Sequence, residues 1–286
     1  MNAFREILSR LPASVCQELE ILPDADLREL QEVRLRCGQR IVLRYDGREK
    51  SLVRIVSKED LQKTLNNLIK HSYYAYEEDL AKGFVTIEGG HRVGICGKAV
   101  VKNGQPSLIK EVSSMNIRFA KEIKGCANSL IPVILKDGRP ENILIVSPPG
   151  CGKTTLLRDM TRCMSMRGIQ TAVCDERSEI AGMYSSSPSF DLGPRTDVLD
   201  GCDKMLIRSM APQVIVTDEI GKEGDVSAVE QCMNAGISLV TSIHGCCRRD
   251  IENSNIGSLL AKKFFSSIIY LSAEKGPGTI REIENA

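Results

Sequence analysis

The sequence predicts an α/β protein in which a core with a parallel sheet follows a smaller α+β domain. Three observations support this prediction. The chain has 286 residues, which is enough for two domains. Its rear part alternates apolar β-runs with helical segments, a pattern typical of parallel sheets covered by helices on both faces. Its front part instead joins short strands through turns that contain Gly. We therefore expect domains at 1–125 and 126–286.

The composition limits the classes of function that the chain can have. Hydrophobic residues make up 42% and charged residues 26%, which excludes disordered and collagen-like architectures. The 38 Lys and Arg nearly balance the 37 Asp and Glu, so no overall field holds the protein on nucleic acid or on an anionic membrane. The start of the chain is charged, unlike a signal peptide, and the apolar run 264–273 is about half the ~20 residues that a membrane helix needs. We expect a cytoplasmic protein.

The front domain is expected to pack hairpins on helices. Residues 4–19 carry apolar side chains at helical spacing, which predicts an opening amphipathic helix. Short apolar runs between 33 and 56 predict strands. Ser57 precedes a helical pattern with Asp60 three residues further on, which predicts a capped helix. Residues 83–118 return to strands and turns.

The segment SPPGCGKTT has the residues of a phosphate-binding loop. It follows an apolar strand and opens a helix, which is the context that such a loop requires. Backbone N–H groups of the loop and the positive end of the helix are expected to cradle the phosphates of ATP. Lys153 is expected to reach the β- and γ-phosphates, and the Thr154 hydroxyl to bind Mg²⁺. The expected nucleotide-binding residues are Pro149, Gly150, Cys151, Gly152, Lys153, Thr154 and Thr155.

A second apolar strand, VIVTD, ends in the acidic pair Asp218 and Glu219. A carboxylate at the end of such a strand is suited to hold Mg²⁺, so Asp218 is the expected metal residue. Glu219 is expected to act as the general base that polarises the attacking water. The alternative is that the two acids cap a helix that starts near Lys222.

Two further core strands end in polar residues. Glu176 lies in the acidic segment CDERSE and is the third expected metal residue; a solvated acidic turn is the alternative. His244 ends the strand LVTSIH and is expected to sense the γ-phosphate, although a lone histidine is often structural.

These features together resemble the type II and type IV secretion (traffic) ATPases, whose core is RecA-like. Within that superfamily the chain is most similar to the stage III sporulation protein AA family. The sequence departs from the family at Ser147, where Gly is usual, and after Asp200, where GCDKMLIRSM is several residues short. The similar segments cover most of the chain and are GFVTIEGGHRVGICGKAV, SSMNIRFAKEIKGCA, SPPGCGKTTLLRD, DERSEIAG, GPRTDVLDG and RSMAPQVIVTDEIG.

The resemblance implies a Mg²⁺-dependent ATPase that forms a homo-oligomeric ring, a hexamer. It also implies attachment to the inner face of a membrane in the mother cell, through subunits of a membrane-embedded sporulation complex and without nucleic acid. In the relatives, arginines of the N-terminal domain reach the nucleotide. The matching residues are Arg92 and Arg118, although an arginine on a strand is more often a surface salt-bridge partner. They join Glu219, Lys153 and His244 as expected catalytic residues.

Two other functions stay open at this point. A nucleic-acid-associated ATPase can use the same core, but the balanced charge and the 4% of aromatic residues argue against it. A nucleotide-gated scaffold with little turnover is suggested by Ser147. Retention on heparin tests the first alternative, and steady-state phosphate release tests the second.

Overall fold

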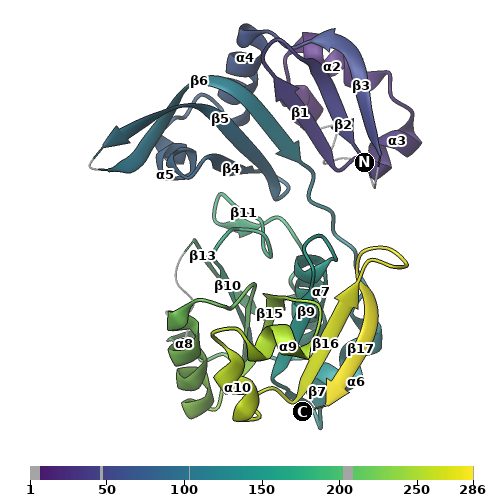
Figure 1. Ribbon diagram of the computed structural model, residues 1–286, viewed down its shortest axis with the longest axis vertical. Coiled ribbons are helices and arrows are strands. Elements are labelled where there is room, and N and C mark those ends of the chain that lie inside the picture. Colours follow the sequence, from purple (N-terminus) through teal and green to yellow (C-terminus); the bar gives the residue numbers. More distant parts are fainter. Residues whose placement is uncertain (1–6, 46–47, 103, 202–208, 286) are drawn as a thin grey trace. The chain divides into compact units, whose positions relative to one another are not determined.

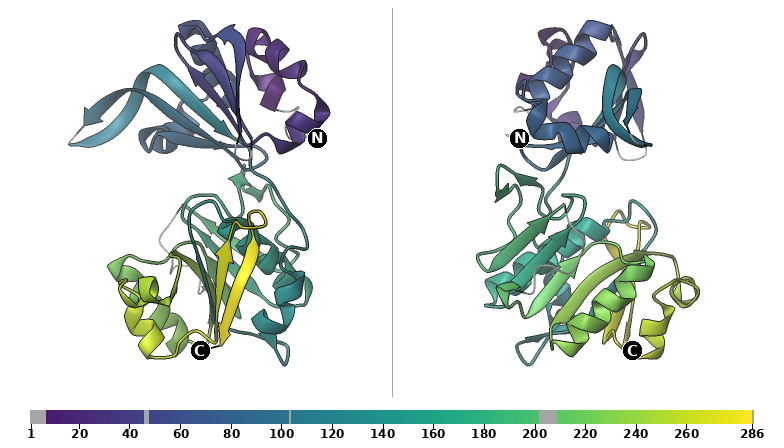
Figure 2. Two further views of the ribbon diagram at one scale, coloured as in Figure 1. Left: turned by 45° about the vertical axis from the view of Figure 1, so that its right-hand side comes forward. Right: turned by 90° about the vertical axis from the view of Figure 1, so that its left-hand side faces the viewer.

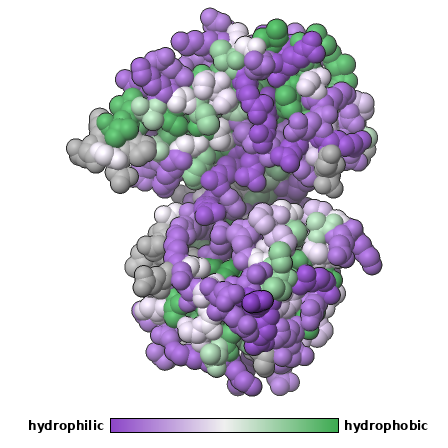
Figure 3. Space-filling view, viewed as in Figure 1, coloured by the Kyte–Doolittle hydropathy of each residue, from purple (hydrophilic) through white to green (hydrophobic). Residues whose placement is uncertain are grey.

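A computed structural model describes residues 7–45, 48–102, 104–201 and 209–285 of the chain (Figure 1). The chain divides into two compact units, Met1–Ala120 and Lys121–Ala286, and each is described by itself. Most of the shortened stretch after Asp200 lies outside the described residues. Among the helices of the described ranges, none is long and apolar enough to cross a membrane. The face shown in Figure 3 is mainly hydrophilic, with hydrophobic side chains in separate groups.

The first unit is a six-stranded antiparallel sheet with helices packed on it, in the strand order β3-β2-β1-β6-β5-β4 (Figures 1 and 2). On β1, Val33 and Leu35 are buried against helix residues such as Leu61 and Leu65, while Arg34 and Arg36 alternate with them on the other face. The elements are α2 (Ala13–Glu20), α3 (Asp24–Glu29), β1 (Glu32–Arg36), β2 (Arg40–Arg44), β3 (Glu49–Ile55), α4 (Lys58–Leu68), η1 (Tyr74–Tyr76), α5 (Glu77–Ala81), β4 (Phe84–Ile87), β5 (His91–Lys102) and β6 (Gln105–Arg118).

Two helix boundaries test the expectations for this unit. The capped helix is confirmed, because the Ser57 hydroxyl accepts from the Asp60 N–H while the Asp60 carboxylate accepts from the Ser57 N–H. The single opening helix over 4–19 is wrong. Residues 7–10 are helical, but α2 begins anew at Ala13, because Pro12 adopts an extended conformation before it and has no N–H to donate.

The second unit is a seven-stranded sheet in the order β13-β10-β14-β15-β9-β16-β17, parallel except for β17. The prediction of an α/β core with a mostly parallel sheet is confirmed. Its elements are η2 (Asn128–Leu130), α6 (Ile131–Ile134), β7 (Leu135–Lys136), β8 (Arg139–Pro140), β9 (Ile143–Ser147), α7 (Lys153–Met166), β10 (Thr171–Asp175), β11 (Met183–Tyr184), β12 (Ser187–Pro188), β13 (Thr196–Asp200), β14 (Val214–Thr217), α8 (Glu223–Asn234), β15 (Ser238–His244), α9 (Arg248–Glu252), α10 (Gly257–Ala261), β16 (Ser267–Ser272) and β17 (Thr279–Asn285).

The central strands of this sheet are apolar because both of their faces are covered. Every residue of β9 is buried. Ile143 and Ile145 pack in one core cluster with residues of α7, whereas Leu144 and Val146 pack in another with residues of α8 and α10. The two-sided cover accounts for continuous apolar runs in place of alternation.

Residues 121–125 belong to the second unit, although the sequence places them at the end of the first domain. The Arg158 guanidinium donates to the carbonyl oxygen of Lys121 at 2.8 Å. Lys124 forms an ion pair with Asp191 at 2.6 Å. These contacts put the boundary between the units at Ala120 and Lys121.

Candidate nucleotide-binding site

The predicted phosphate loop joins β9 to α7. Gly150 and Gly152 have φ values of +78° and +85°, in the left-handed region that only glycine adopts without strain. Gly152 is also the residue that caps the start of α7, so the first N–H groups of the helix have no partner within the helix. A loop of this shape at a helix start is suited to bind an anion.

The turn between β16 and β17 contacts the phosphate loop and forms a hydrogen bond to it. The N–H of Gly278 donates to the carbonyl oxygen of Cys151 at 2.8 Å. A Cβ atom added to Gly152 would lie 2.9 Å from that same nitrogen, so the close approach requires glycine. Gly278 was not among the predicted site residues, because a glycine more than 120 positions from the loop shows no sign in the sequence of its contact with it.

Lys153, His244 and Glu219 come together beside the loop. Lys153 is buried, and its Nζ lies 2.8 Å from Nδ1 of His244 at the end of β15. The Nε2 atom of His244 lies 3.7 Å from Oε1 of Glu219. Burial lowers the pKa of Lys153, and the nearby carboxylates of Asp218 and Glu219 oppose that shift.

Thr154 and Asp218 also meet, although they are far apart in the sequence. The Thr154 hydroxyl donates to Oδ2 of Asp218 at 2.7 Å. The other oxygen, Oδ1, accepts from the Ser242 hydroxyl at 2.5 Å. A hydroxyl and a carboxylate are oxygen ligands of the kind that Mg²⁺ takes together with substrate phosphates, so this pair fits the expected metal.

Glu219 has an unusual backbone conformation, with φ at +38°. This left-handed conformation is energetically unfavourable for a residue with a Cβ atom, and such backbone strain is common at functional sites. Its N–H donates to both Oδ1 of Asp218 and Oγ of Ser242, at 3.0 and 3.1 Å. Its carboxylate lies 3.3 Å from the Arg177 guanidinium.

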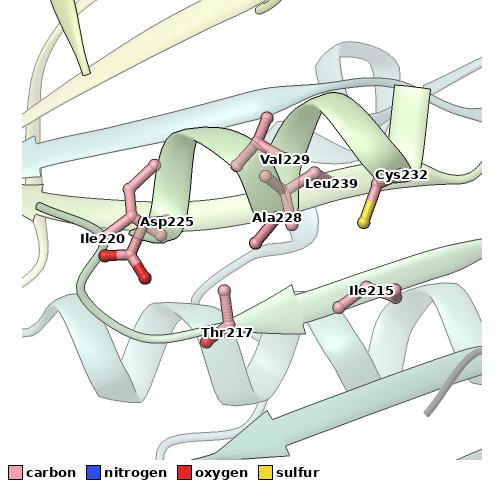
Figure 4. Close-up of a pocket in the computed structure, with 8 residues that line it drawn as sticks. All are labelled: Ile215, Thr217, Ile220, Asp225, Ala228, Val229, Cys232 and Leu239. Atoms are coloured by element: carbon pink, nitrogen blue, oxygen red, sulfur yellow. The ribbon is translucent and has the colours of Figure 1, made fainter. Parts of the chain in front are cut away.

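The chain after Glu219 is anchored by Asp225, a buried residue in the first turns of α8. Its Oδ2 accepts from the N–H groups of Gly221 and Lys222, both at 2.8 Å. Figure 4 shows Asp225 beside Thr217 and Ile220 in the small pocket beneath α8. Asp225 was not among the predicted site residues. The sequence pattern that could have indicated it is an acid three residues after Lys222, because that spacing is typical of the start of a helix.

The acidic segment after β10 is built around Asp175. Its carboxylate accepts from the N–H groups of Glu179, Ile180 and Ala181 at 2.8–2.9 Å. Burial raises the pKa of Asp175 to about 6. Glu176 forms an ion pair with Lys222 at 2.5 Å. The binding of a metal ion by Glu176 stays a prediction.

Arg92 and Arg118 lie in the first unit as direct cross-strand partners on β5 and β6. The Arg92 guanidinium sits 3.8 Å over the ring of Phe84. The Nε atom of Arg118 lies 3.7 Å from a carboxylate oxygen of Glu32. The approach of either arginine to a nucleotide stays a prediction.

Two solved structures with a similar fold are a pilus retraction motor and an ATPase. The pilus retraction motor PilT with bound ADP superposes with a TM-score of 0.58 at 14% identity, covering 90% of this chain and 76% of that one. The ATPase DotB of Yersinia pseudotuberculosis superposes with a TM-score of 0.59 at 12% identity, covering 97% and 80%. At such low identities the similarity concerns the fold, and it confirms the predicted α/β core with a mostly parallel sheet.

Relatives in sequence are closer. Stage III sporulation protein AA of Bacillus subtilis (strain 168) is 38% identical over 289 residues, which cover 97% of this chain and 94% of the relative. The uncharacterized protein ycf45 of Porphyra purpurea is 27% identical, over 79% of this chain and 40% of its own length. The family described as Sporulation stage III, protein AA matches residues 2–286, and this chain belongs to it.

Proposed function

We propose that this chain binds ATP together with Mg²⁺ and hydrolyses it, and that hydrolysis drives assembly of, or transport by, a membrane-embedded sporulation complex. The observation that carries the proposal is the 2.7 Å contact between Thr154, at the start of α7, and Asp218, after β14. The family of the chain and its secretion-ATPase fold support the same activity, and one of the similar structures holds ADP.

Phosphoryl transfer asks a protein mainly for positioning and for neutralisation of charge. In the proposed reaction the loop N–H groups hold the phosphates, and the Lys153 ammonium offsets their negative charge. Thr154 and Asp218 would hold Mg²⁺, which would neutralise the negative charge that develops on the phosphate oxygens. Glu219 orients the attacking water and takes its proton. His244, which contacts both Lys153 and Glu219, senses the γ-phosphate.

The finer parts of the proposal concern assembly. We propose a homo-oligomeric ring, a hexamer, attached to the inner face of a membrane through protein partners in the mother cell. Arg92 and Arg118 would then deliver charge to a nucleotide and so couple hydrolysis to the position of the first unit. Membership of a sporulation family supports the setting.

The test of the enzymatic part is steady-state phosphate release from ATP by the purified chain, with Mg²⁺ or with EDTA. We expect release that requires Mg²⁺ and that Glu219→Gln abolishes. Glu282→Gln, which changes an exposed acid on β17, is the matched control and should release phosphate at the wild-type rate. Nucleotide binding without release would instead support a scaffold, and stimulation by nucleic acid would support the nucleic-acid-associated alternative.

The test of the cellular part is a pull-down from sporulating cells with wild type and Lys153→Ala. We expect membrane proteins of the sporulation complex to be recovered with the wild type, and their recovery to change when nucleotide binding is lost. Flotation of the pure protein with anionic vesicles is the control. Strong binding to bare vesicles would contradict attachment through protein partners.

A further inference from the structure

The hydroxyl group of Ser242 joins two residues of the candidate site. Ser242 is fully buried on β15. Its Oγ donates to Oδ1 of Asp218 at 2.5 Å and accepts from the Glu219 N–H at 3.1 Å. Its carbonyl oxygen accepts from the N–H of Ile220 at 2.8 Å. One residue therefore bonds to three successive positions of the chain after β14.

The bond to Asp218 determines how that carboxylate is turned. The last torsion of an aspartate side chain has broad preferences, so its hydrogen-bond partners decide the orientation. Here Oδ1 accepts from the Ser242 hydroxyl and from the Glu219 N–H, and Oδ2 accepts from the Thr154 hydroxyl. Without the Ser242 hydroxyl, Oδ1 keeps only the bond from the Glu219 N–H, which lies in the same strained segment, so the carboxylate is held less firmly.

The bond to Glu219 supports a strained backbone. The φ of +38° at Glu219 persists only where surrounding contacts enforce it. The Ser242 hydroxyl and carbonyl accept from the N–H groups of Glu219 and Ile220, on either side of the Glu219 α-carbon. Because β14 and β15 pair in parallel, with Thr217 opposite Thr241, Ser242 lies at the right level to make these bonds.

We propose that Ser242 is a positioning residue that orients Asp218 toward a divalent cation and holds Glu219 in its strained conformation. The inference rests on the proposed function, because that function makes Asp218 the metal residue and Glu219 the base. It assigns to Ser242 a role that does not require contact with the nucleotide. The adjacent Thr241 provides the contrast, since it is equally buried but its hydroxyl has no hydrogen-bond partner in the part of the chain that the structure describes.

The experiment measures metal affinity separately from nucleotide affinity in the full chain. Mn²⁺ is titrated in the presence of a non-hydrolysable ATP analogue, and free Mn²⁺ is read by electron paramagnetic resonance. We expect Ser242→Ala to weaken Mn²⁺ binding by about 10-fold or more, the usual effect of removing a residue that orients a metal ligand. Binding of the analogue in EDTA should stay within about two-fold of wild type, because the phosphate loop is unchanged and the chain is folded.

Two further variants make the result specific. Ser242→Thr keeps the hydroxyl, so its Mn²⁺ affinity should stay within about three-fold of wild type. Thr241→Val removes the neighbouring unpartnered hydroxyl and should bind Mn²⁺ as the wild type does. The inference is overturned if Ser242→Ala binds Mn²⁺ as wild type does, if Thr241→Val loses as much affinity, or if Ser242→Thr fails to restore it.

The same samples separate this inference from the proposed function. A wild type that binds Mn²⁺ with the analogue but releases no phosphate from ATP contradicts hydrolysis, while the comparison of Mn²⁺ affinities still decides the role of Ser242. A wild type that turns over ATP, with a Ser242→Ala variant of equal Mn²⁺ affinity, supports the function and overturns the inference.

Discussion

The Nζ atom of Lys153 lies 2.8 Å from Nδ1 of His244, so the cation of the phosphate loop contacts the histidine that ends β15. The contact is possible because β9 and β15 are neighbours and Ser147 is paired with His244 across them. Lys153 is buried beside this histidine. Burial destabilises the charged ammonium, and bound phosphate oxygens would place negative charge next to it.

We expect the affinity for ATP to fall with rising pH, and to begin falling below the ordinary pKa of a lysine side chain. Burial lowers the pKa of Lys153, so the group loses its proton at a lower pH than a free lysine does. Below that pKa the ammonium is present and binding is strongest; above it the neutral amine no longer offsets phosphate charge. Titrating a fluorescent ATP analogue between about pH 7 and 10 measures the effect. Lys153→Ala is the control, and a parallel decline in that variant would contradict the assignment.

Lys153→Ala and Glu219→Gln should separate binding from turnover. The ammonium neutralises charge that the substrate already carries, so its loss weakens or abolishes ATP binding. The carboxylate acts on the attacking water, so Glu219→Gln should bind ATP as the wild type does and release no phosphate. Equilibrium binding and steady-state release on both variants check this. An equal loss of binding in the two would show that the roles are assigned wrongly.

Arg92→Ala and Arg118→Ala should each lower turnover while ATP affinity stays within a few-fold of wild type. An arginine that acts on transition-state charge can contribute ~10³–10⁵ in rate. Replacement by lysine should not restore the rate fully, because lysine lacks the planar fork of the guanidinium. Arg36→Ala, which removes an exposed arginine of the same sheet, is the matched control. Full turnover in both test variants would exclude these two arginines from the reaction.

Asp175 should make the free energy of unfolding decrease between about pH 4 and 6. Burial raises its pKa to about 6 from an ordinary value of 3.8, so the folded chain keeps a proton that the unfolded chain has released. The stabilisation is complete below the unfolded pKa and is lost as the pH rises through the folded one, by up to about 3 kcal/mol. Urea denaturation of wild type and Asp175→Asn across this range measures the difference.

In that experiment the variant is neutral at every pH, so its profile should lack this part of the decline. Asp137→Asn, in an exposed turn, is the control and should follow the wild type. Identical profiles for wild type and Asp175→Asn would show that the Asp175 carboxyl does not titrate in this range.

Patterns that are local in the sequence were enough to predict much of this protein. The apolar runs of β9 and β14, the glycines of the phosphate loop and the capping pair Ser57 and Asp60 all depend on neighbours within a few residues. The acidic and histidine strand ends were found in the same way, since each polar residue directly follows an apolar run. The prediction of a single opening helix was wrong because the helical spacing of apolar residues continues past Pro12, whereas the helical backbone is interrupted there.

The meeting of these elements was decided by the tertiary structure. The order β13-β10-β14-β15-β9 places β14, β15 and β9 side by side, although β9 lies far from the other two in the sequence. That order brings Thr154 to Asp218, Lys153 to His244, and Ser242 to both Asp218 and Glu219. Strand order depends on how apolar faces pack across the whole sheet, and so does the approach of Gly278 to the phosphate loop. A serine or glycine that works only through such a neighbour looks like any other in the sequence, because the contact that defines it exists only after the strands have assembled.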